Sequence, residues 1–231
     1  MNSFHLKIIA VVTMLVDHIG LFFFPQFGVM RIIGRLSFPL FAWFVANGAR
    51  YTRDPKKYLV RMIIFAMVSQ VPFALANDLV YSNFHLFNAV FTLSIGLAGI
   101  MFIQKTDNKF TWGVIAIGAF LFAELFGSDY GGAGVLSVIF FYIFFDKIQW
   151  MVLSQILIYG LLVTYPAVND VMIHSVNPNN FVSLWEIFGL FSLIFIAVYN
   201  KERGPKIKYI FYAIYPLQYV IFYLLLISGA K

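Results

Sequence analysis

The feature that most limits how this chain can fold is a series of nine apolar segments, each bounded by charged residues, proline or glycine. The segments are Leu6–Phe24, Val29–Gly48, Leu59–Ala76, Leu86–Ile103, Phe110–Phe126, Gly134–Phe145, Trp150–Val163, Phe181–Tyr199 and Tyr209–Ser228. Most reach the roughly 20 residues that a helix needs to cross the hydrocarbon core of a bilayer. The sixth and seventh are shorter, which favours tilted, broken or re-entrant helices. The sequence therefore predicts an all-α, polytopic integral membrane helix bundle with about nine transmembrane helices.

The overall composition supports this class. Only 11% of the 231 residues are charged and 61% are hydrophobic, whereas a soluble domain carries roughly a quarter charged residues. So few polar groups cannot cover a surface that faces water, which excludes a soluble fold. The chain shows no internal repeat or low-complexity segment, and we expect one transmembrane domain over residues 1–231. The absence of cysteine excludes disulfides, thiolate metal sites and a cysteine nucleophile.

Lysine and arginine are unevenly distributed between the loops, because they follow the second, fourth, sixth and eighth segments. They are Arg50, Arg53, Lys56, Lys57 and Arg61; Lys105 and Lys109; Lys147; and Lys201, Arg203, Lys206 and Lys208. The alternate loops, around Asp78, around Asp129 and over residues 166–180, contain neither residue type. Positively charged loops face the cytoplasm, so the N-terminus is predicted to be cytoplasmic and the C-terminus external. The net charge of +6 then reflects topology, and we expect no nucleic-acid partner.

Charged residues inside the apolar segments cost ~2.5–3.5 kcal/mol at a helix centre and therefore indicate functional sites. Asp17 and His18 lie about ten residues beyond Lys7, or ~15 Å along a helix, near the middle or outer half of the bilayer. Arg31 and Arg35 are four residues apart and share one face of a helix. One interpretation is that Asp17 pairs with either arginine only to hold two helices together. The other is that the excess cation binds an anionic ligand such as a phosphate or carboxylate.

The histidines differ in position. His18 is the only one deep inside a segment, where an imidazole could act as a general base at neutral pH. The others, His5, His85 and His174, lie at segment ends or in loops and lack the spacing of metal ligands, so we expect no metal site. Asn88 and Thr92 share one face of the fourth segment, which is typical of hydrogen bonds between membrane helices.

The cations from Arg50 to Arg61 have two interpretations. They are a topology signal that also attracts anionic membrane lipids, or they bind the phosphates of a cytosolic donor that carries a nucleotide.

Two stretches of sequence resemble the opening of the TraX family: residues 6–20, LKIIAVVTMLVDHIG, and residues 31–41, RIIGRLSFPLF. The likeness continues in the same order over nearly the whole chain. It is carried by Ala46–Gly48, Tyr51–Arg53, Lys57–Arg61, Ser69–Phe73, Asn88–Gly96, Asp129–Val135, Tyr199–Gly204 and Lys208–Leu217. One residue departs from the family pattern. Gln218 follows Tyr-Pro-Leu where the resemblance leads us to expect histidine, and it cannot perform the acid–base chemistry of an imidazole.

The resemblance implies a function. The TraX family is named for a conjugation-linked protein that acetylates the N-terminus of pilin, and it is similar to the wider superfamily of multi-span membrane acyltransferases. The chain would then be an acetyltransferase of the bacterial cytoplasmic membrane that uses acetyl-CoA as donor and holds no bound cofactor. His18 would be the catalytic base, assisted by Asp17, and Arg31 and Arg35 would bind the donor or the transition state. The acceptor would be an amine or hydroxyl of pilin, another peptide or a surface glycan.

Further residues are expected to bind the donor. We expect Arg50, Arg53, Lys57 and Arg61 to hold the phosphates of coenzyme A, and Asn88 to contribute to donor or substrate binding. Two other functions stay open. The buried charges could form the site of a proton-coupled transporter or flippase, or they could be purely structural in a noncatalytic assembly protein.

Overall fold

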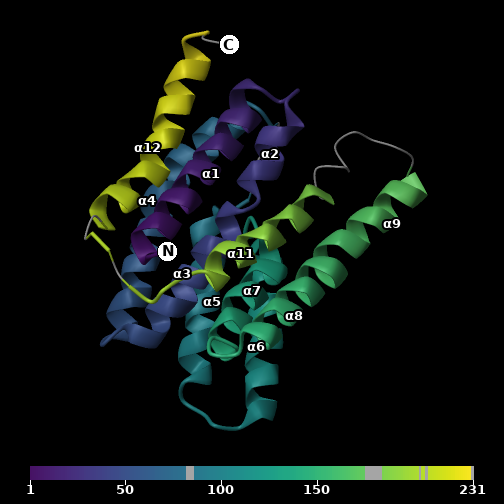
Figure 1. The fold of residues 1–231 in the computed structure, drawn as a ribbon. Coiled ribbons are helices and arrows are strands. Elements are labelled where there is room, and N and C mark those ends of the chain that lie inside the picture. The colour runs from purple at the N-terminus through teal and green to yellow at the C-terminus, as the bar shows by residue number, and fades with distance from the viewer. Residues whose placement is uncertain (82–85, 175–183, 203, 206–207, 230–231) are drawn as a thin grey trace. The chain divides into compact units, whose positions relative to one another are not determined.

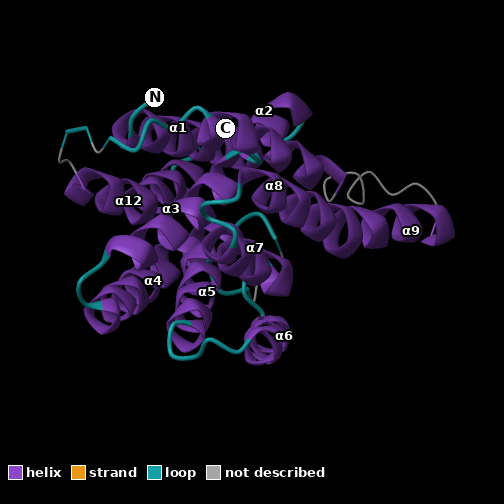
Figure 2. Ribbon diagram, turned by 60° about the horizontal axis from the view of Figure 1, so that its bottom comes forward, coloured by secondary structure: helices purple, strands orange, loops and turns teal. Residues whose placement is uncertain are grey.

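The computed structural model describes residues 1–81, 86–174, 184–202, 204–205 and 208–229 (Figure 1). Within these ranges the chain is helical and has no β-strand, apart from an isolated bridge between Phe87 and Ser128 (Figure 2). The helices are α1 (Ser3–Phe23), α2 (Gly28–Gly34), α3 (Ser37–Tyr51), α4 (Pro55–Asp78), α5 (Ala89–Ile103), α6 (Lys109–Phe126), α7 (Gly131–Ile143), α8 (Ile148–Leu157), η1 (Ile158–Thr164), α9 (Tyr165–His174), η2 (Trp185–Phe191), α11 (Ser192–Ala197) and α12 (Lys208–Ile227). The predicted all-α class is confirmed.

Five helical stretches of the described chain are long and apolar enough to cross a membrane: Ser3–Phe23, Gly28–Tyr51, Pro55–Asp78, Lys109–Phe126 and Ile148–Asn169. Shorter apolar helices cover Ala89–Ile103, Gly131–Ile143, Trp185–Ala197 and Tyr212–Ile227. These lengths identify an integral membrane protein. The count of nine crossings and the cytoplasmic N-terminus stay predictions. Phe181, where the eighth segment was predicted to begin, lies outside the described residues, as do His85, Arg203 and Lys206.

Polar side chains begin several of the helices. Asn2, Asp54, Asn88 and Asn108 precede α1, α4, α5 and α6, and each side chain accepts a hydrogen bond from a backbone N–H of the first turn. Such caps satisfy an N–H group that the start of a helix leaves without a partner. At Asp54 the bond from the Lys57 N–H also holds the pKa of the exposed carboxyl below its usual range.

The second predicted segment, Val29–Gly48, is not one continuous helix. It is divided between α2 and α3 by a turn at Arg35 and Leu36. Pro39 accounts for the break, because it has no N–H to donate to the Arg35 carbonyl four residues earlier and its ring crowds that carbonyl. The side chain of Arg35 therefore projects from the end of α2 rather than from the middle of a regular helix.

The seventh predicted segment, Trp150–Val163, is part of a longer helical stretch, Ile148–Asn169. The prediction ended it too early because a proline, here Pro166, normally ends a helix. The structure instead forms a π-helix, η1, just before the proline. The wider π turn changes the hydrogen-bond register by one residue immediately before the proline.

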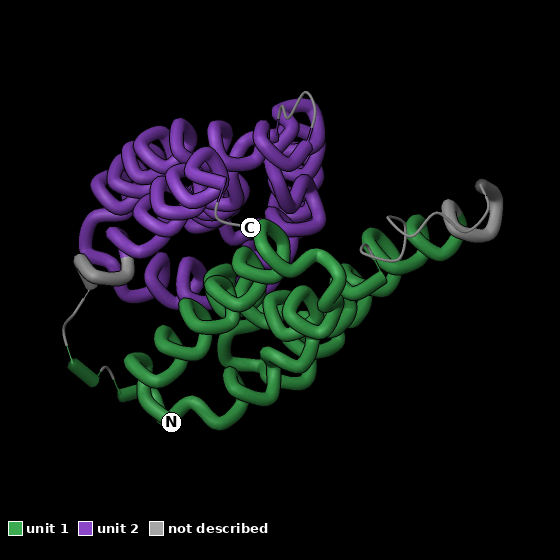
Figure 3. The backbone as a smooth tube through the Cα atoms, turned by 90° about the horizontal axis from the view of Figure 1, so that it is seen from above, with its two compact units in different colours: residues 1–42, 144–206 green, residues 43–143, 207–231 purple. Residues whose placement is uncertain are grey.

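The contacts of the chain form two compact units, each built from two stretches of sequence (Figure 3). The first contains residues 1–42 and 144–206. In this unit α1 packs against α2, and η2 packs against both α2 and η1. The N-terminus is tied to the chain beyond α11, since the Met1 ammonium donates to the Val198 carbonyl at 3.0 Å and the Ser3 N–H donates to the Glu202 carbonyl at 2.8 Å.

The second unit contains residues 43–143 and 207–231, with α5 packed against α4, α6 and α7. α12 lies along α4, and aromatic rings meet edge to face between them: Phe65 with Tyr215 and Phe73 with Tyr219, with centroids 6.0 and 5.2 Å apart. Glu124, near the end of α6, accepts the Gly132 N–H at 2.6 Å in the first turn of α7. A carboxylate is stabilising there because the start of a helix carries partial positive charge.

Candidate functional site: a buried ion-pair network

The first unit brings α1 and α2 together around Asp17. Gly34 of α2 makes the close approach possible, because a Cβ atom at this position would lie 2.1 Å from the Asp17 Cβ. Gly20 has the same role one turn further along α1, where a Cβ would lie 2.7 Å from the Met30 Cβ. The two glycines allow the arginines of the α2 region to reach the Asp17 carboxylate.

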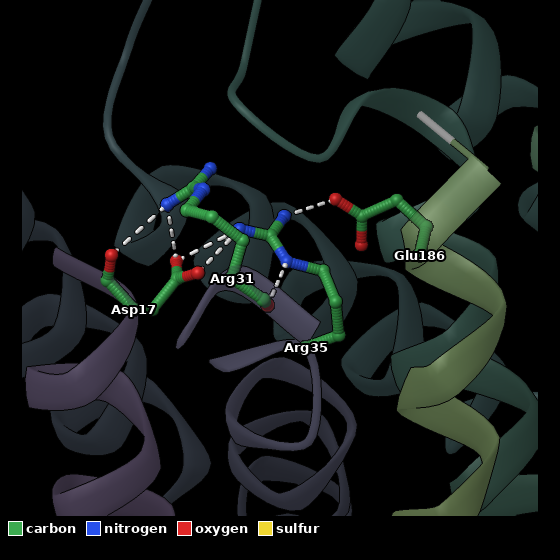
Figure 4. A network of polar contacts seen from close by, with 4 residues as sticks. All are labelled: Asp17, Arg31, Arg35 and Glu186. Carbon is green, nitrogen blue, oxygen red and sulfur yellow. Dashed lines mark hydrogen bonds and ion pairs between the residues drawn. The ribbon is translucent and has the colours of Figure 1, made fainter. Parts of the chain in front are cut away.

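Four charged side chains meet at this point: Asp17, Arg31, Arg35 and Glu186 (Figure 4). Nη2 of Arg35 donates to both carboxylate oxygens of Asp17, at 2.7 and 2.8 Å. Nη1 of Arg31 contacts the same carboxylate at 2.9 Å and the Asp17 carbonyl at 3.3 Å. Nη1 of Arg35 donates to the Glu186 carboxylate. The pairing of Asp17 with an arginine, which the sequence left open, is present, and Asp17 pairs with both arginines.

The network is buried and charge-balanced. The exposed fraction of the side chain is 7% for Asp17, 6% for Arg35, 14% for Arg31 and 19% for Glu186. Two carboxylates and two guanidinium groups sum to zero formal charge, so the excess cation inferred from the sequence is neutralised by Glu186. Such a network joins helices without leaving an uncompensated charge in a medium of low dielectric constant.

Glu186 was not predicted as a site residue, although the sequence contains a signal for it. It is the only charged residue of the predicted segment Phe181–Tyr199. Glu186 lies in the 3-10 helix η2, and Gly189, one turn later, allows η2 to approach the break between α2 and α3. A Cβ on Gly189 would lie 3.0 Å from the Arg35 carbonyl oxygen, 3.2 Å from Pro39 Cγ and 3.4 Å from the ring of Tyr159 in η1.

The two arginines are not equivalent. All three nitrogens of the Arg35 side chain are engaged, since Nε also donates to the Arg31 carbonyl at 3.2 Å. Arg31 uses only Nη1, and no residue of the described chain accepts a hydrogen bond from its Nε or Nη2. Arg35 therefore uses all of its side-chain nitrogens to hold neighbouring groups in place, whereas Arg31 retains donors for a ligand.

His18 follows Asp17 in α1 and is half-buried. Consecutive residues of a helix point about 100° apart, so the imidazole and the Asp17 carboxylate diverge from the backbone. Because Asp17 is held by both arginines, its main role in the structure is to position these residues. The catalytic role of His18 stays a prediction.

The other predicted donor-binding residues lie in the second unit. Arg50, Arg53, Lys57 and Arg61 are exposed around the start of α4. The Lys57 ammonium lies 3.2 Å from the Asp54 carboxylate, and the Arg61 guanidinium lies 5.9 Å from the centroid of the Tyr58 ring. Pairs this exposed contribute little to stability, so these cations remain accessible to an anion.

Asn88 is fully buried between helices. Its Nδ2 donates to the Ala66 carbonyl at 2.9 Å and to Gln70 Oε1 at 2.8 Å, and its Oδ1 accepts the Val90 N–H at 3.0 Å. These bonds engage both polar atoms of the side chain, as expected of a residue that joins membrane helices. Its proposed part in donor binding stays a prediction.

In the part of the chain that the structure describes, no group of three or more histidine, cysteine, aspartate or glutamate side chains could hold a metal ion. The candidate site contains ion pairs and one neighbouring imidazole, which are acid–base and hydrogen-bonding groups.

The fold and the site together define an α-helical integral membrane protein with a buried, charge-balanced ion-pair network. A protein-family model described as TraX protein matches residues 3–226, so the chain belongs to the TraX family. The family resemblance is confirmed over nearly the whole length.

Two relatives extend this comparison. The chain is 27% identical to the probable fimbrial assembly protein FimC, serogroup H1, of Dichelobacter nodosus, covering 94% of this chain and 92% of the relative. It is 30% identical over 105 residues to the uncharacterized protein RP591 of Rickettsia prowazekii (strain Madrid E), covering 46% of this chain and 39% of that protein. No solved structure matches the chain.

Proposed function

We propose that this protein is an acetyltransferase of the bacterial cytoplasmic membrane that moves an acetyl group from acetyl-CoA to an amine or hydroxyl. The observation that carries the proposal is the arrangement around Asp17. This carboxylate holds Arg31 with two unused nitrogen donors, and the next residue, His18, is the imidazole that the sequence predicts as a base. A base and a cationic hydrogen-bond donor are the two groups that acyl transfer from a thioester requires.

In the proposed reaction the acceptor nitrogen or oxygen attacks the carbonyl carbon of the thioester while His18 takes the proton from the acceptor. The carbonyl oxygen becomes an oxyanion, which accepts hydrogen bonds from Nε and Nη2 of Arg31. Collapse of this intermediate breaks the carbon–sulfur bond. The leaving thiolate receives the proton from His18, and the products are an acetylated amide or ester and coenzyme A.

Asp17, Arg35 and Glu186 act as positioning residues in this mechanism. Asp17 fixes Nη1 of Arg31 at 2.9 Å and so leaves the other edge of the guanidinium open. Arg35 holds Asp17 through two hydrogen bonds and is itself held by Glu186. A group fixed before the reaction stabilises developing charge without a reorganisation cost.

Exposed cations of the second unit support an acetyl-CoA donor, and the name of a relative supports a surface-structure acceptor. Coenzyme A carries phosphates, and the exposed cations Arg50, Arg53, Lys57 and Arg61 offer charge-assisted hydrogen bonds to such groups. A relative whose name refers to fimbrial assembly makes a pilus subunit a natural acceptor to test, beside peptides and surface glycans.

The test uses purified protein with radiolabelled acetyl-CoA and a membrane fraction or pilin as acceptor. Transfer of label to the acceptor is expected. His18→Gln should lower the rate by about 10²–10⁴-fold, the usual contribution of a general base, with nearly unchanged thermal stability. His5→Gln is the matched control, since His5 is an exposed histidine of the same helix. A folded His18→Gln protein that transfers acetyl at the parent rate would overturn the assignment.

A noncatalytic role in assembly is the second candidate, favoured by the name of the relative and by a network in which every charge has a partner. The same experiment separates the two. An assembly protein transfers no label, and its variants should impair surface structures in proportion to lost stability only. A proton-coupled transporter would instead move a solute across proteoliposomes in response to a pH gradient.

A further inference from the structure

An open apolar groove runs between α5 and α6 in the second unit, with a volume of about 380 Å³. It extends from Ile95 to Phe102 on α5 and from Ile115 to Phe122 on α6. At 1.5 Å per residue each wall is ~10 Å long. This length lies within one leaflet of a bilayer, whose complete hydrocarbon core is ~30 Å thick. The dimensions match a single lipid chain that runs beside the helices.

Small residues on both walls leave the groove between the two helices unfilled. At Gly118 of α6 an added Cβ would meet no atom within 4 Å. Gly99 on the opposite wall is different, because a Cβ there would lie 2.8 Å from Ile139 Cδ1. Phe122, at one end, is 55% exposed. An unfilled groove would forfeit dispersion contacts along its whole length.

A cation stands at the other end of the groove. The Lys105 ammonium lies 5.1 Å from the centroid of the Phe102 ring, and this ring lines the groove. Lys109 begins α6 in the same short loop, and both lysines are exposed. Asp107 lies between them in the sequence, so the three charged side chains of the loop leave one net positive charge. An apolar groove with a cation at one end is complementary to a lipid with an anionic headgroup.

We propose that this groove binds one acyl chain of an anionic phospholipid, with the phosphate held by Lys105 and Lys109. The lipid would complete the packing of α6. Only 11% of the most apolar window of this helix is buried within the protein. By mass action, a ligand that binds only the folded state stabilises it, and the gain grows with the logarithm of the ligand concentration relative to Kd. The inference is independent of acetyl transfer, since it rests on a different part of the molecule.

The experiment is native mass spectrometry of detergent-purified protein given phosphatidylglycerol or phosphatidylcholine with identical acyl chains. The parent should retain phosphatidylglycerol about fivefold more than phosphatidylcholine, the ratio expected for one net cation near the headgroup. Gly118→Leu should lose the bound lipid, because Gly118 lines the groove and a Cβ there meets no protein atom within 4 Å. Gly113→Leu is the matched control: a Cβ there also meets nothing within 4 Å, but Gly113 does not line the groove.

The double variant Lys105→Gln/Lys109→Gln leaves Asp107 as the only charged residue of this loop and should no longer prefer phosphatidylglycerol over phosphatidylcholine. Equal retention of lipid by Gly118→Leu and Gly113→Leu would overturn the proposal. The proposal would also be overturned if the parent formed a dimer and Gly118→Leu disrupted this dimer without releasing the lipid. The groove would then belong to a contact between two copies of the chain. Preference for phosphatidylglycerol in the double lysine variant would refute the assigned headgroup site.

Discussion

Replacing Asp17 by asparagine is the sharpest test of the ion-pair network. The Asp17 carboxylate accepts hydrogen bonds from Arg35 at 2.7 and 2.8 Å and contacts Arg31 at 2.9 Å. Asparagine preserves the size of the side chain but removes the charge and turns an NH₂ group toward a guanidinium. The network changes from neutral to one net positive charge at a site where the residue is 5% exposed.

The expected cost follows from this geometry. Removing one partner of a buried ion pair destabilises a protein by about 3–5 kcal/mol, or roughly 6–20 °C in Tm for a chain of this size. Glu186→Gln should cost less, about 1.5–3 kcal/mol, the usual contribution of a hydrogen bond to a charged group. The difference arises because Arg35 keeps both of its bonds to Asp17, and because the Glu186 side chain is 19% exposed.

The assay is thermal unfolding in a mild detergent, followed by tryptophan fluorescence, for Asp17→Asn, Glu186→Gln and Asp107→Asn. The last is the control, since Asp107 is exposed in the loop before α6 and such changes usually stay within about 0.5 kcal/mol. We expect Tm to be highest for Asp107→Asn, lower for Glu186→Gln and lowest for Asp17→Asn. An Asp17→Asn protein as stable as the Asp107→Asn control would refute the reasoning, and so would a larger loss for Glu186→Gln than for Asp17→Asn.

Three further predictions concern other parts of the chain. Gly189→Ala should lower both Tm and acetyl transfer more than Ile187→Ala, a change at a neighbouring exposed residue. The reason is that a Cβ on residue 189 would lie 3.0 Å from the Arg35 carbonyl oxygen and would displace η2, which carries Glu186. Equal effects of the two changes would show that the close approach is unimportant. Gln218→Met should raise Tm, because Gln218 is 4% exposed and neither polar atom of its amide has a hydrogen-bond partner in the described chain. A buried polar group without a partner lowers the stability of the fold by about 1–3 kcal/mol. A lower Tm would mean that water or a ligand satisfies the amide. Reporter fusions should place residues 54–57 in the cytoplasm and the C-terminus outside, and a cytoplasmic C-terminus would contradict an odd number of crossings.

Much of the local structure could be predicted from the sequence. The positions of the apolar segments agree with the helices because both depend on composition over short distances. The predicted helix ends were wrong at two prolines. Pro39 lies just after a break at Arg35 that divides one segment, whereas Pro166 follows a π turn and does not end the other helical stretch. Whether a proline ends a helix depends on what surrounds the freed carbonyl, which the local sequence does not contain.

For the site, the sequence by itself determined that Asp17, Arg31 and Arg35 would need partners, because a lone charge inside a membrane segment is too costly to leave alone. Only the tertiary structure decided which charges meet. It brings Glu186 to Arg35 across 151 positions of the chain. It also makes the two arginines different, since all three side-chain nitrogens of Arg35 are engaged, whereas two of those of Arg31 donate to no described residue. The physical reason is that helix periodicity fixes which residues share a face within a few turns, whereas ion pairing depends on the packing of helices that are distant in the chain.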